Sequence, residues 1–102
     1  MQNSLLSEQC CEPLALQEVM DLRAAAPLAA RLLAAQGSSL VLDGSKVRRI
    51  GAQCMQLIVS AHLTWERDGL NLTLARASAE LVEAFEIAGI KIDGLMEKEP
   101  TQ

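Results

Sequence analysis

Few side chains in this sequence could carry out chemistry, and their spacing does not bring them together. His62 is the only histidine, and no Cys, Asp or Ser is placed to pair with it as a nucleophile or as a second metal ligand. A lone histidine of this kind is expected to pack in a core or at its rim. The chain also has no Gly-rich phosphate loop and no pair of carboxylates at a catalytic spacing. The pattern predicts a protein that is not an enzyme and that has neither a metal site nor a cofactor.

The cysteines and aspartates are explained by structural roles. Cys54 falls on the apolar side of a predicted helix, where a small buried hydrophobe is expected. With Cys10 and Cys11 the count is three, which is odd, and neighbouring cysteines rarely bridge one another. Both points disfavour a disulfide framework and favour a reducing cytoplasm. Four aspartates adjoin the ends of predicted elements, where they cap helices or form turns: Asp21, Asp43, Asp68 and Asp93.

Composition excludes further classes of protein. The chain has 102 residues, half of them apolar, which is enough for one domain with one core. A net charge of −4, with one Trp, one Phe and no Tyr, disfavours nucleic-acid binding, which typically needs a basic surface or aromatic platforms. No apolar run approaches the ~20 residues of a membrane span, and the opening MQNSLLSEQCC does not resemble a secretory signal. We expect a cytoplasmic protein with no membrane insertion.

Strand and helix patterns alternate along the chain. The segment 13–21, PLALQEVMD, has two short apolar pieces around a polar pair and predicts a bent strand or a small hairpin. Pro27 is typical of a first helical turn, which predicts a helix from there to a stop at Gly37. The later segments predict strands over 39–43 and 70–75, a helix over 52–67, and a helix capped by Ser78 that stops at Gly89.

This order predicts an α/β fold. We expect a small mixed sheet of about four strands, mixed because of the hairpin, covered by about three to four α-helices. The domain should span residues 12–95, between a flexible N-terminus over 1–11 and a polar tail over 96–102. One core should contain six apolar residues from these strands and helices: Val41, Leu57, Ile58, Leu72, Leu81 and Phe85.

The junction between the strand at 39–43 and the helix at 52–67 carries two surface patterns. The loop between them holds three positive charges, and the helix has polar residues three or four apart along one stripe. Both patterns suit a docking surface for an acidic partner, and both are also ordinary for solvated surface.

The succession of these segments resembles the STAS family, of the anti-sigma-factor-antagonist type, over roughly 12–95. The most specific part is a strand that ends in Asp43, followed by Val47, Ile50 and a helix start at Gly51. In many members of that family this helix start reads Asp-Ser-Ser-Gly or Asp-Thr-Ser-Gly, and a partner kinase phosphorylates a hydroxyl there.

This chain departs from that motif at each chemical position. Gln53 stands where the family usually has its phosphoacceptor, and it has no hydroxyl to phosphorylate. Gly51, Ala52 and Cys54 replace the Asp, the first hydroxyl residue and the Gly. The resemblance therefore implies a docking surface that is not switched by phosphorylation at this position.

What the resemblance implies for function is a bacterial, non-enzymatic regulatory domain. Its partner would be a signalling kinase, either of the anti-sigma type or the histidine kinase of chemotaxis, bound through the loop 44–51 and the helix that follows. One alternative is a STAS subunit of a transporter ATPase of the lipid-trafficking type, and another, from a different class, is a nucleotide-binding or enzymatic domain. A second copy of the chain is a further candidate partner. The residues expected to contact the partner are Ser45, Lys46, Arg48, Arg49, Gln53, Gln56 and Ser60.

Overall fold

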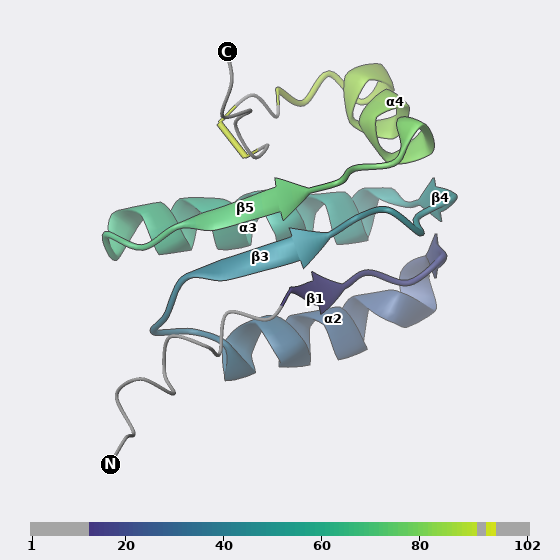
Figure 1. Ribbon diagram of the computed structural model, residues 1–102. Coiled ribbons are helices and arrows are strands. Elements are labelled where there is room, and N and C mark those ends of the chain that lie inside the picture. Colours follow the sequence, from purple (N-terminus) through teal and green to yellow (C-terminus); the bar gives the residue numbers. More distant parts are fainter. Residues whose placement is uncertain (1–12, 92–93, 96–102) are drawn as a thin grey trace.

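The fold is an α/β arrangement in which helices lie on one side of a small sheet (Figure 1). The computed structural model describes residues 13–91 and 94–95, which contain three helices and five short strands. Residues 1–12, 92–93 and 96–102 fall outside the described residues, and Cys10, Cys11 and Asp93 are among them.

The larger sheet has three parallel strands. In spatial order these are β1 (Leu14–Ala15), β3 (Leu40–Asp43) and β5 (Leu72–Ala75). A second, two-stranded parallel sheet pairs β2 (Val19–Met20) with β4 (Arg49–Ile50). The α/β class and the STAS-like architecture predicted from the sequence are confirmed.

The hairpin considered for 13–21 is not formed. β1 and β2 do not pair with each other, because each pairs in parallel with a later strand of a different sheet. The segment forms two separate short strands, so it is neither the hairpin nor the single bent strand considered from the sequence. Every strand pair within the described residues is parallel, so the mixed sheet inferred from the hairpin is wrong for this part of the chain.

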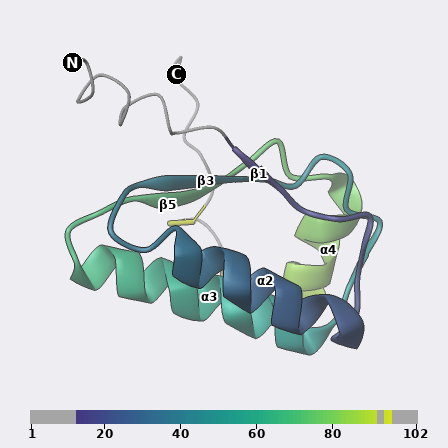
Figure 2. The same cartoon turned by 90° about the horizontal axis from the view of Figure 1, so that it is seen from below.

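Two neighbouring helices that run in the same direction, α2 (Leu22–Ala34) and α3 (Ala52–Arg67), cover one face of the three-stranded sheet (Figure 2). The third helix, α4 (Ala79–Ile87), lies beside β4 at the end of the sheet (Figure 1). The apolar face of α3 meets the sheet with the buried residues Cys54, Met55, Ile58, Ala61 and Trp65. The bounds of α3 agree with the predicted helix over 52–67.

Helix α2 begins earlier than predicted. Asp21 is its N-cap, and the Asp21 carboxylate accepts a hydrogen bond of 3.0 Å from the Arg23 amide. Pro27 therefore lies inside the helix and not in its first turn, which corrects the prediction. The cap and the alanine-rich sequence favour the helical state strongly enough to accommodate an exposed proline.

The core lies between the helices and the sheet, with Phe85 and Leu81 closing it from α4. Both side chains are fully buried, as are Ile58 and Leu72, and all four belong to one apolar cluster, as predicted. Leu57, predicted for the same core, is partly buried and packs against the cluster. Val41 is also only partly buried, because side chains alternate along β3 and its neighbours Leu40 and Leu42 take the inward face. Val41 was wrongly assigned to the core.

Candidate functional site

The loop that follows β3, residues 44–50, is held by backbone hydrogen bonds from two sides. On the β2 side, the Arg48 amide donates to the Glu18 carbonyl at 2.8 Å, and the Gly51 amide donates to the Met20 carbonyl at 2.9 Å. On the other side, the Gly44 amide donates to the Ala75 carbonyl at the end of β5, at 3.0 Å. The loop is therefore fixed in place before any partner binds.

Asp43, the last residue of β3, links the loop to the segment after β5. Its Oδ1 accepts a hydrogen bond of 2.9 Å from the Ser45 amide, and its Oδ2 lies 2.5 Å from Nη2 of Arg76. These contacts favour the ionised carboxylate. The hydrogen bond from the Ser45 amide, and after it the Arg76 guanidinium, lower the pKa of Asp43 from 3.8 to about 2.

Titration of Asp43 gives a direct check on these contacts. Followed by NMR of the side-chain carboxyl, the wild-type protein should show a pKa near 2 for Asp43. Because this pKa is lower in the folded than in the unfolded chain, the ionised group stabilises the fold above about pH 4, and this stabilisation is lost as the pH falls through about 2. Arg76→Gly should raise the pKa only part of the way, since the Ser45 amide is the larger cause. A wild-type pKa near 3.8 would contradict both contacts.

The three positive charges of the loop are not equivalent. Lys46, Arg48 and Arg49 are all exposed, but Nη1 of Arg48 lies 3.2 Å from Oε2 of Glu18 in an exposed ion pair. Such a pair contributes little to stability, yet it cancels one charge of the predicted positive surface. Lys46 and Arg49 take part in no ion pair within the residues that the structure describes.

The polar residues at the start of α3 lie along an open groove between α2 and α3. Gln53, Gln56 and Ser60 are exposed and line it from α3, together with the partly buried Leu57. The opposite wall is a row of small residues on α2, namely Ala25, Ala26 and Ala29. The volume of the groove is about 480 Å³.

Farther along the same two helices, the groove continues into a more apolar stretch. Leu33 of α2 and Gln36, just after that helix, line one side, and Leu57, Ser60 and Thr64 line it from α3. The Leu33 side chain is 67% exposed, so the stretch presents apolar surface to solvent. The sequence prediction identified the α3 side of this groove and missed the α2 side.

The first turn of α3 separates the loop from the groove. Gly51 is the N-cap residue and provides no side-chain hydrogen bond to the turn. The amides of a first turn have no partner within their own helix, and this helix end lacks the side-chain cap that Asp21 gives to α2. Gln53 is exposed on this turn, with an amide that can both donate and accept. The loop, the uncapped turn and the α3 wall of the groove therefore follow one another along residues 44–60.

A comparison with known protein families identifies the family to which this chain belongs. The family model described as "Mlab, STAS domain" matches residues 7–97, nearly the whole chain. The chain belongs to the STAS family. No curated protein and no solved structure matches it. The family supports a general regulatory or protein-interaction role for this STAS domain.

The two reactive side chains of α3, His62 and Cys54, lie about two helical turns apart. His62 is mostly buried at the rim of the core, where Nδ1 donates to the Leu72 carbonyl at 3.1 Å, as expected for a lone packed histidine. Cys54 is buried as predicted, its Sγ lies 3.5 Å from the Asp21 carbonyl oxygen, and burial raises the pKa of its thiol. Within residues 13–91 and 94–95, no three His, Cys, Asp or Glu side chains are grouped so that they could hold a metal ion.

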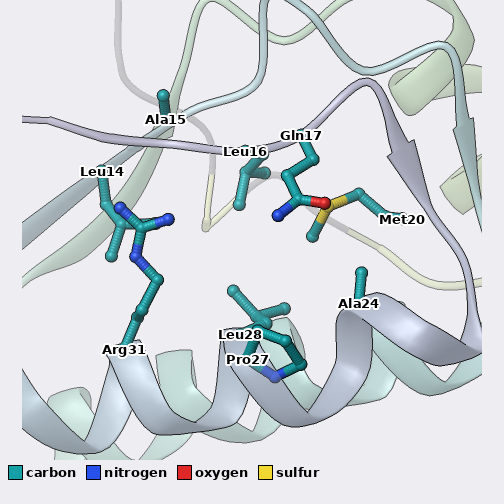
Figure 3. A pocket seen from close by; sticks show the side chains of 9 residues that line it. All are labelled: Leu14, Ala15, Leu16, Gln17, Met20, Ala24, Pro27, Leu28 and Arg31. Atoms are coloured by element: carbon teal, nitrogen blue, oxygen red, sulfur yellow. The ribbon is translucent and has the colours of Figure 1, made fainter.

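A small enclosed space lies between the 14–17 segment and α2 (Figure 3). The side chains of Leu16, Met20 and Leu28 point toward it, and its volume is about 10 Å³. A space of that size holds at most one water molecule. It is not a ligand pocket.

Among the described helices of the STAS domain, none is long and apolar enough to cross a membrane.

Proposed function

We propose that this STAS domain is a non-enzymatic docking module that binds a regulatory protein in the cytoplasm through the loop 44–51 and the first three turns of α3. The observation that carries this proposal is that a loop fixed by backbone hydrogen bonds, a helix start without a side-chain cap and an open groove follow one another along residues 44–60. Within it, Gln53, Gln56 and Ser60 are exposed polar residues beside a wall of alanines, which a partner can approach closely.

The partner would meet a surface of modest positive charge. Lys46 and Arg49 supply that charge, while Glu18 offsets Arg48 and Glu80 lies against the same part of the loop. Exposed charges of this kind act mainly on the rate of association and less on the lifetime of a complex. The polar groove beside them would carry the contacts that determine dissociation.

The leading candidate partner is a signalling kinase, of the anti-sigma type or the histidine kinase of chemotaxis. Residues 51–54 offer such a kinase no hydroxyl, so it would bind this domain without phosphorylating the start of α3. That same feature favours a second candidate, a transporter ATPase that carries the domain as a subunit. A subunit that is bound permanently needs no phosphoacceptor.

The test is binding of three variants to the kinase or transporter ATPase encoded beside the gene, measured by titration calorimetry and by association kinetics. Arg49→Glu should slow association, with an effect that shrinks as the salt concentration rises. Gln56→Arg should raise the dissociation rate by about tenfold or more, because a bulky charge would enter the groove. The control Glu83→Arg, on the exposed face of α4, should change neither rate.

All three side chains are exposed, so each variant should keep its free energy of unfolding within about 0.5 kcal/mol. If Glu83→Arg abolishes binding while the other two variants bind normally, the interface lies on α4 and the proposal is wrong. Binding of ATP to the isolated domain would favour the nucleotide-binding alternative.

A further inference from the structure

Arg76 has an unusual backbone conformation at the end of β5. Its φ angle is +52°, and it is the one non-glycine residue with positive φ in the part of the chain that the structure describes. The left-handed conformation costs a residue with a side chain about 1 kcal/mol or more. Such strain persists only where surrounding contacts hold the residue in place.

Arg76 forms an ion pair with Asp43 across the ends of β3 and β5. Nη2 of Arg76 lies 2.5 Å from Oδ2 of Asp43, and the Asp43 side chain is only 14% exposed. The other carboxylate oxygen accepts from the Ser45 amide, at the beginning of the loop. One carboxylate thus connects the strained residue to the loop that we propose as the docking element.

Ser78 makes a second connection between the same two segments. Its Oγ donates to the Val47 carbonyl at 2.6 Å and accepts from the Leu81 amide at 3.1 Å, as the N-cap of α4. Its own amide donates to the Gly44 carbonyl at 3.1 Å. Capping α4 needs only an acceptor at position 78, whereas the bond to Val47 needs a donor as well.

We infer that Asp43, Arg76 and Ser78 are positioning residues that hold the loop 44–51 in the conformation that binds the partner. This inference rests on the proposed function, because it assigns a role to residues that do not themselves form the docking surface. We refer to the three residues as the loop clamp. A loop ordered before binding does not lose conformational freedom on binding, so the clamp raises affinity without touching the partner.

The chain allows the clamp to be broken without destroying the fold. Arg76→Gly removes the ion pair but places at φ +52° the residue that adopts this angle most easily, so the loss of the pair is offset by relief of strain. Ser78→Asp keeps an N-cap acceptor for the Leu81 amide but has no donor for the Val47 carbonyl. Ser78→Thr keeps both bonds and is the matched control.

The experiment has two readouts, amide hydrogen exchange in the free protein and the dissociation constant for the partner. In Arg76→Gly and Ser78→Asp, the Ser45 and Val47 amides should exchange about tenfold faster, the free energy of unfolding should stay near the wild-type value, and affinity should fall by about tenfold. Arg76→Lys, which keeps the positive charge, and Ser78→Thr should stay close to wild type in both readouts.

The possible outcomes distinguish failure of the loop clamp from failure of the proposed docking function. Unchanged exchange at the Ser45 and Val47 amides in Arg76→Gly and Ser78→Asp would overturn the clamp and leave the docking proposal standing. Faster exchange with unchanged affinity would show that the loop does not contact the partner, and the docking role of the loop would fall together with the positioning role. Equal loss of affinity in Ser78→Asp and Ser78→Thr would also overturn the clamp, because Ser78→Thr retains both hydrogen bonds.

Discussion

Replacing Phe85 by alanine is expected to lower the free energy of unfolding by about 3–5 kcal/mol. Phe85 is the largest fully buried side chain of the described core, and it fixes α4 against the rest of the domain together with Leu81. Removal of the ring loses its burial and leaves a cavity that the surrounding leucines fill only partly. Urea denaturation followed by circular dichroism measures the loss.

A matched control lies on the same helix. Ile87 is 79% exposed, so Ile87→Ala should change the free energy of unfolding by less than about 0.5 kcal/mol. A loss below about 1 kcal/mol for Phe85→Ala, or an equal loss in both variants, would contradict the packing of α4 on the core.

Elements with strong local signals could be predicted from the sequence. The polar stripe over 52–67, followed by a turn at Asp68, predicted α3 with its observed bounds. Ser78 was correctly predicted as the N-cap of α4. The apolar run ending in Asp43 gave β3 within one residue. In each case the side chains that determine the element lie within it or next to it, so no knowledge of the tertiary structure was needed.

The pairing of β1 and β2 could not be predicted in the same way. Each strand is two residues long, and its partner lies about thirty residues away in the sequence, at β3 or β4. Two residues carry no periodicity that could distinguish a hairpin from two separate parallel pairs. The start of α2 was misplaced for another reason: Pro27 suits a first turn, but Asp21 offered a cap six residues earlier.

The candidate site was predictable on one side only. The stripe on α3 could be read from periodicity, but the groove also needs the alanines of α2, and only the packing of the two helices brings Ala25 and Ala29 opposite Gln56. The pairing of Arg48 with Glu18 likewise depends on the β2–β4 sheet. The sequence-based prediction therefore assigned the loop more unpaired positive charge than it has. It also left out the α2 wall of the groove beside α3.

Gly44 and Gly51 lie at the two ends of the loop 44–51, and replacing each of them by serine should have opposite effects on stability. At Gly44, an added Cβ would lie 2.5 Å from Cδ2 of Leu81, 3.3 Å from Cδ1 of Leu74 and 3.4 Å from the Ala77 backbone. Leu81 is fully buried and has little room to move. At Gly51, the nearest atom to an added Cβ is the Met20 carbonyl oxygen at 3.8 Å, and the backbone is extended with φ −94°.

Gly44→Ser should therefore lower the free energy of unfolding by about 3 kcal/mol, since overpacking costs about 1–3 kcal/mol and the new hydroxyl would be buried among carbon atoms. Gly51→Ser should leave stability unchanged or raise it by a few tenths of a kcal/mol, because serine at the N-cap of α3 can accept from an amide of the first turn. Thermal and urea denaturation of the two variants, measured side by side, provide the test. If both variants lose stability equally, or if Gly44→Ser is the better tolerated, the close packing of Gly44 against Leu81 of α4 is wrong.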